Sequence, residues 1–113
     1  MKKLLFAFVI LLVVLIGCSI FDFSIDVKYE VTGSANKVDV TYANKDEGTS
    51  QANDVSIPWS YSFEGEGDQF VYISAQNQGQ SGSVTVTIYR DGKKFKRSTS
   101  TGAYCIASAS GLL

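Results

Sequence analysis

Apolar and polar residues alternate with a period of two along most of the chain after residue 24. In residues 25–33, Val27 and Tyr29 fall on one face, and Lys28 and Glu30 fall on the other. A strand with this alternation buries one face and leaves the other to solvent. The same pattern predicts half-buried strands of an antiparallel sheet in three further segments, residues 37–44, 55–63 and 84–90.

Residues 69–77 form a fifth predicted strand with a different pattern. The run FVYI at residues 70–73 is apolar on both faces, which is typical of a central or partly covered strand. Two more strands are expected in residues 93–101 and 103–110, and the first follows Asp91-Gly92, a pair typical of a tight hairpin turn. About seven strands at intervals of roughly ten residues predict an all-β fold, an immunoglobulin-like antiparallel β-sandwich.

The chain before residue 24 shows no alternation, and its charged residues are Lys2, Lys3 and Asp22. Lys2 and Lys3 precede an unbroken apolar run of 14 residues, 4–17. This length suits the apolar region of an export signal, whereas a membrane-spanning helix usually needs about 20 residues. The alternative is a retained helical anchor, because the apolar count reaches 18 at Phe21. The first segment is therefore predicted to be a signal or anchor helix.

The letters LIGC at residues 15–18, which close this run and add Cys18, match the pattern at which bacterial lipoproteins are processed. The small Gly17 lets a peptidase approach the backbone, and the thiol of Cys18 accepts the diacylglycerol. We therefore predict a lipoprotein signal peptide in residues 1–17, with cleavage between Gly17 and Cys18. Residues 18–24 would be the lipidated cysteine and a short linker, and residues 25–113 the folded domain.

Composition narrows the function of the exported part. Cleavage before Cys18 leaves 96 of the 113 residues, with eight Lys and Arg against eleven Asp and Glu, hence a net charge of −3. Nucleic-acid binders are normally basic, so this class of partner is not expected. The chain has no histidine, and Cys105 is the only cysteine besides Cys18, which removes the usual general base and the Cys/His metal sites. We predict a protein that is not an enzyme and needs no cofactor or metal.

Two groups of residues are candidates for contacts. Basic residues crowd the RDGKKFKR hairpin, where they would touch anionic headgroups or an acidic partner, or protect an edge strand from aggregation. Four aromatic residues are candidates for an apolar ligand site, against the alternative of core packing, in which Trp59 would fill the centre. The basic group is Arg90, Lys93, Lys94, Lys96 and Arg97, and the aromatic group is Trp59, Tyr61, Phe70 and Tyr72. The acidic EGEGD turn at residues 64–68 is typical of a solvated turn, and a calcium loop is its alternative reading.

Several blocks, in this order and spacing, resemble the MmpS family of small mycobacterial membrane proteins. They are YEVTGSANKVDVTY, SIPWSYSF, VYISAQNQGQSGSVTVTIYRDGK and STSTGAY. The resemblance implies an immunoglobulin-like sandwich outside the cytoplasmic membrane that serves as an accessory to RND-type transporters of the MmpL kind. It implies no catalytic residues.

These observations together predict a lipid-anchored protein of the cell membrane that faces the extracytoplasmic side. Its expected role is that of a non-enzymatic accessory or interaction protein, with the membrane and an RND-type export system as partners. The alternative is an envelope binding module that holds a small apolar or glycolipid ligand between its sheets.

Overall fold

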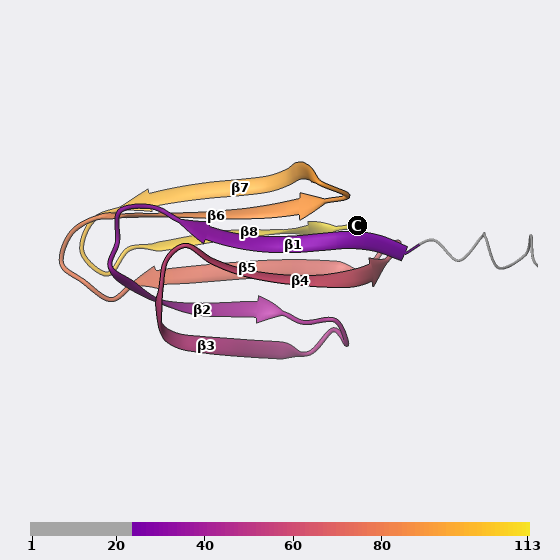
Figure 1. Ribbon diagram of the computed structural model, residues 1–113, viewed down its shortest axis with the longest axis horizontal. Coiled ribbons are helices and arrows are strands. Elements are labelled where there is room, and N and C mark those ends of the chain that lie inside the picture. The colour runs from indigo at the N-terminus through magenta and orange to yellow at the C-terminus, as the bar shows by residue number, and fades with distance from the viewer. Residues whose placement is uncertain (1–23) are drawn as a thin grey trace, which may run out of the picture.

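The computed structural model describes residues 24–113, which fold into eight antiparallel strands without a helix (Figure 1). The predicted signal or anchor helix, its cleavage site and Cys18 lie outside the described residues. The strands are β1 Ser24–Thr32, β2 Lys37–Ala43, β3 Thr49–Ser56, β4 Trp59–Glu66, β5 Phe70–Asn77, β6 Ser83–Arg90, β7 Lys93–Thr101 and β8 Ile106–Leu112. They form two four-stranded sheets, sheet A in the order β4-β1-β6-β7 and sheet B in the order β3-β2-β5-β8. The predicted all-β sandwich is confirmed, with eight strands in place of about seven.

The additional strand comes from a segment where the sequence pattern is misleading. Residues 55–63 were predicted as one strand, but β3 ends at Ser56 in sheet B and β4 begins at Trp59 in sheet A. The two residues between them are Ile57 and Pro58, joined by a cis peptide bond. Proline has no amide hydrogen to give to a ladder, so the chain leaves one sheet and enters the other at this point.

The core lies between the sheets and is built mainly from valine and isoleucine. Tyr29 of β1 is fully buried at its centre, whereas Trp59, which was predicted to fill the centre, is only partly buried at the β4 edge. The backbones of the two sheets come closest where β6 and β7 face β5 and β8. At the opposite side, aromatic rings from β2 and β4 fill the wider gap. The other core side chains at no more than 1% exposure are Val27, Val31, Val38, Val40, Val71, Ile73, Ala75, Val84, Val86, Ile88 and Ala107.

The sandwich has two distinct ends, which matter for function. The ladder registers place Ser24 opposite Glu66 and Phe70 opposite Leu112. The start of β1, the β4–β5 turn and the end of β8 therefore lie together, and the β6–β7 hairpin is at the same end (Figure 1). We call this the proximal end, because the chain that precedes Ser24 leaves from it. The β1–β2, β3–β4, β5–β6 and β7–β8 connections lie at the opposite, distal end.

Candidate functional site

The hairpin predicted at Asp91-Gly92 is present at the proximal end. Asp91 and Gly92 have φ angles of 50° and 80°, the left-handed pair that a primed turn requires. The turn is also tied to β1, because the Asp91 amide donates to the Asp26 carbonyl at 2.7 Å and the Asp26 amide donates to the Asp91 carboxylate at 3.0 Å. The turn of the hairpin is thus fixed to the start of β1, its neighbour in sheet A.

The five basic residues of this hairpin do not form a single patch. The β6–β7 ladder has a bulge, since Ile88 pairs with Lys96 while Tyr89 pairs with Lys94, which leaves Phe95 unpaired. Paired residues share a face of the sheet, so Lys96 lies on the inner side with Ile88 and Lys94 on the outer side with Tyr89. An inward-pointing lysine beside a bulge is a common protection of an edge strand, and β7 is the edge of sheet A.

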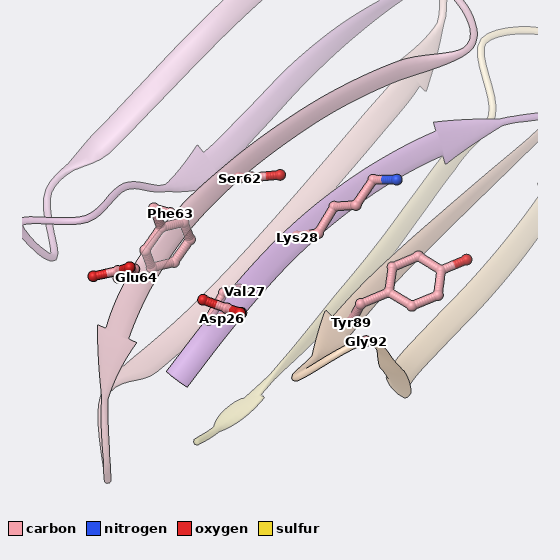
Figure 2. A pocket seen from close by; sticks show the side chains of 8 residues that line it. All are labelled: Asp26, Val27, Lys28, Ser62, Phe63, Glu64, Tyr89 and Gly92. Carbon is pink, nitrogen blue, oxygen red and sulfur yellow. The ribbon is translucent and has the colours of Figure 1, made fainter. Parts of the chain in front are cut away.

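A groove of about 630 Å³ lies at the proximal part of sheet A (Figure 2). The side chains of β4 form one wall, and Tyr89 forms the other across β1. It is lined by Asp26, Val27, Lys28, Ser62, Phe63, Glu64, Tyr89 and Gly92.

Polar contacts fix the Tyr89 wall of this groove. The Tyr89 hydroxyl donates to the Glu30 carboxylate at 3.1 Å, and the Lys28 ammonium is 3.6 Å from the same carboxylate. The hydrogen bond to Glu30 raises the pKa of Tyr89 above its ordinary value. Lys28 also lies 5.7 Å from the centre of the Tyr89 ring, within reach of a cation–π contact. The groove therefore offers apolar surface beside charged groups that are held in place.

A second groove, of about 360 Å³, brings the acidic turn of residues 64–68 together with the β2–β3 loop. The amide of Gln69 joins them, because its oxygen accepts from the Glu66 amide at 2.9 Å and its nitrogen donates to the Lys45 carbonyl at 3.1 Å. Within residues 24–113, no group of three or more His, Cys, Asp and Glu side chains is arranged to hold a metal ion. The residues that line this groove are Lys45, Asp46, Glu47, Glu64, Glu66, Gly67, Asp68 and Gln69.

The four aromatic residues predicted to line a ligand site are not brought together. Trp59 and Tyr61 point between the sheets and pack on Tyr42, with ring centroids 5.3 and 4.7 Å apart. Phe70 and Tyr72 stack on each other at 6.4 Å on the outer face of sheet B. The apolar run of β5 has one buried face, so its aromatic residues turn outward.

Tyr29 links the two sheets, whereas the sequence pattern predicted only that it lies on the buried face of its strand. The Tyr29 hydroxyl donates to the Ala43 carbonyl at 2.6 Å and accepts from the Tyr72 amide at 3.3 Å. Burial raises its pKa to about 12, although the hydrogen bond from Tyr72 acts in the opposite direction. A buried tyrosine hydroxyl usually needs a hydrogen-bond partner. A tyrosine on the apolar face of a predicted strand is therefore the sequence signal for a link of this kind between the sheets.

Cys105 falls within residues 103–110, which were predicted as a strand. It is a free, partly buried cysteine, and it directly precedes β8. Its amide donates to the Gly102 carbonyl, so it belongs to the β7–β8 turn. The strand predicted at residues 103–110 begins later, at Ile106, because residues 102–105 are used for this turn.

The fold and these surfaces define a class of protein, a small immunoglobulin-like β-sandwich with grooves on its outside. Between Ser24 and Leu113 there is no helix with the length and hydropathy needed to cross a bilayer. The family described as Mycobacterium membrane protein matches residues 18–110, and the chain belongs to this family, the one that the MmpS resemblance indicated. No curated protein matches the chain at a significant level. Family membership places the protein among membrane-associated proteins of the mycobacterial type.

Proposed function

We propose that the protein is a membrane-anchored accessory without enzymatic activity, which presents its sandwich to a partner in the cell envelope, an RND-type export system. The observation that carries the proposal is the short distance between the anchor and the fold. Only the five residues 19–23 separate Cys18 from Ser24, where β1 begins. A lipid on Cys18 would hold the extracytoplasmic domain within about 20 Å of the membrane, since an extended residue spans at most about 3.6 Å.

Such a tether would let a small domain act on a partner in the membrane. Confinement near the membrane raises its effective concentration for a membrane-embedded partner, without any added contact. Family membership over residues 18–110 supports a membrane-associated role of this kind. The proposal assigns no catalytic residue.

Purification from native membranes tests the proposal. The full chain, cross-linked in the membrane, should enrich an RND-type transporter, and Cys18→Ala should enrich it several-fold less. Radiolabelled palmitate should enter the wild-type chain and not Cys18→Ala. Recovery of the wild-type chain with no transporter enriched would contradict the accessory role. If the wild-type chain stays in the membrane without taking up palmitate, the anchor is a helix and not a lipid.

The groove on sheet A favours a second candidate function, the binding of a small apolar or glycolipid ligand. In this version the ligand lies on the outside of sheet A instead of between the sheets. The Tyr89 ring supplies apolar surface, and Lys28, Ser62 and Glu64 supply polar groups. A ligand that combines acyl and sugar or phosphate groups would match this mixed lining.

Native mass spectrometry of the protein extracted from its own membranes tests this candidate. A bound mass should appear on the wild-type chain and disappear in Ser62→Trp, which fills the groove. Ser60→Trp is the matched control, because Ser60 lies on the same face of β4, two residues nearer the distal end and outside the groove lining. An unliganded wild-type chain would eliminate this candidate.

A further inference from the structure

The outer face of sheet B carries an exposed apolar patch at the proximal end. Phe70 and Leu112 are 49% and 63% exposed, and they lie directly opposite each other in the β5–β8 ladder. Tyr72 extends the patch, because its ring stacks on that of Phe70. We call Phe70, Tyr72 and Leu112 the proximal patch. Grouped apolar side chains on a small soluble domain usually mark a contact with a partner or a membrane.

Backbone hydrogen bonds hold the proximal patch in place. The Leu113 amide donates to the Gln69 carbonyl at 2.9 Å, and the Asp68 amide donates to the Leu113 carbonyl at 3.0 Å. These bonds tie the end of β8 to the β4–β5 turn, so that Leu112 stays beside Phe70. The patch is therefore a fixed feature of the sheet and loses little conformational freedom on contact.

The position of the patch points to its occupant. Ser24, from which the chain leads back to Cys18, lies at the same end of the sandwich. If the chain is anchored at Cys18, as proposed above, the tether of about 20 Å keeps this end at the membrane surface. Phenylalanine, leucine and tyrosine are side chains that partition favourably into the interfacial region of a bilayer.

We propose that the proximal patch rests in the interfacial region of the membrane to which the chain is anchored, and so fixes the orientation of the sandwich. This contact is apolar and not ionic, because the charges at the same end largely offset one another. The second groove carries five carboxylates against one Lys45 ammonium, and the β6–β7 hairpin carries five basic side chains. Anionic lipid should therefore not strengthen the contact.

Depth-dependent quenching by brominated lipid tests the inference. The full chain with Cys18 intact is placed in phosphatidylcholine vesicles with brominated acyl chains, in a Trp59→Phe background. Leu112→Trp should be quenched at least about twofold more than its control Ile106→Trp. Ile106 is the matched site, because it lies on the same face of β8, is 55% exposed and is at the distal end. Phe70→Trp and its distal control Tyr104→Trp, at a residue that is 51% exposed, form a second pair.

Flotation of the same vesicles separates the anchor from the patch. Chains that do not float lack the anchor, and this result would overturn both the proposed tether and the contact. Chains that float with no difference in quenching between the proximal and distal tryptophans would overturn the contact alone. Stronger quenching in vesicles that contain anionic phosphatidylglycerol would show an ionic contact and contradict the apolar one. Circular dichroism confirms that each variant keeps its strands.

Discussion

Tyr29 is the residue on which the joining of the two sheets depends most directly. Its side chain starts in sheet A, and both hydrogen bonds of its hydroxyl end on sheet B. Replacement by phenylalanine keeps the ring and leaves the Ala43 carbonyl and the Tyr72 amide without this partner. We expect Tyr29→Phe to lower the free energy of unfolding by about 1–3 kcal/mol, measured by urea denaturation. An unchanged midpoint would show that water replaces the hydroxyl.

The pKa of Tyr29 predicts a dependence of stability on alkaline pH. The folded protein keeps the Tyr29 proton up to a pKa of about 12, whereas an unfolded tyrosine loses it near 10. The contribution of this proton is complete below pH 10 and is lost as the pH rises to 12, with a slope that approaches about 1.4 kcal/mol per pH unit. Denaturation curves between pH 9 and 12 should show this decline, and Tyr29→Phe should make it shallower. Equal slopes in the two proteins would assign the decline to other groups.

Asn77 performs a similar task at the distal end. Its side-chain nitrogen donates to the Ser81 and Gly102 carbonyls, at 2.9 and 3.1 Å, and its oxygen accepts from the Gly79 amide. One buried amide thus joins the β5–β6 loop to the β7–β8 loop.

Substitution of this amide by a carboxylate should be costly. Asn77→Asp has the same shape, but it turns a negative oxygen toward two carbonyls, and we expect a loss of about 2–4 kcal/mol at pH 7. The loss should shrink as the pH falls toward about 4, because burial raises the pKa of the introduced carboxyl and the protonated acid donates one bond. Asn53→Asp, on the exposed face of β3, is the control and should change the unfolding midpoint little. Similar effects of the two substitutions would remove the special role of Asn77.

At the scale of elements, the strands with strict alternation were predictable and β3 was not. Val55 and Ala52 both face the core, opposite Val38 and Val40, but they are three positions apart in the chain instead of two. The bulge responsible for this lies at Asn53 and Asp54, where Asp54 has a φ of 54°. An extra residue in a strand breaks the period of two, so periodicity predicted a strand only from residue 55 onward.

The motifs behind the family resemblance also have an explanation at this scale. The blocks SAQNQG and STSTGAY are far apart in the chain, yet they meet where Asn77 contacts Gly102 and the Tyr104 amide donates to the Gly79 carbonyl. Two of the blocks behind the family resemblance therefore build the distal loops.

The bulged edge strand β7 leads to a prediction about association. Lys96 lies on the inner side of the sandwich edge, where its stem is close to Gly111 of β8. Lys96→Val removes the charge that opposes pairing of this edge with another chain, and it should raise light scattering in a concentration-dependent way. Lys28→Val is the control, because β1 is paired on both sides. If both variants scatter equally, surface hydrophobicity and not edge pairing is the cause.

At the scale of the whole molecule, the sequence predicted the fold class and the family but not the surfaces. Periodicity says which face of a strand is apolar, and it cannot say which turns meet at one end. The acidic groove joins residues 45–47 to residues 64–69, and the groove on sheet A joins β1, β4 and β6. Phe70 and Tyr72 were predicted beside Trp59 and Tyr61, yet they lie on the far side of sheet B. These arrangements depend on strand order, which alternation does not encode.

The length of the tether provides a test of the whole arrangement. A flexible Gly/Ser insertion of 20 residues between Phe23 and Ser24 leaves every described contact intact. It should lower cross-linking to a membrane partner by about tenfold, because effective concentration falls roughly as the −3/2 power of linker length. The same insertion after Leu113 is the control and should leave the yield unchanged. Equal yields in both proteins would mean that the tether does not govern the encounter.

The central position of β1 has a mechanical consequence. β1 is hydrogen-bonded on one side to β4 and on the other to β6, and the chain enters it from the proximal end. A pull from that side, with the distal loops gripped by another protein, acts along the strand and across the direction of its hydrogen bonds. Two ladders must then shear at once instead of unzipping one bond at a time. The sandwich should therefore resist a pull on its first strand better than one that unzips its ladders one bond at a time.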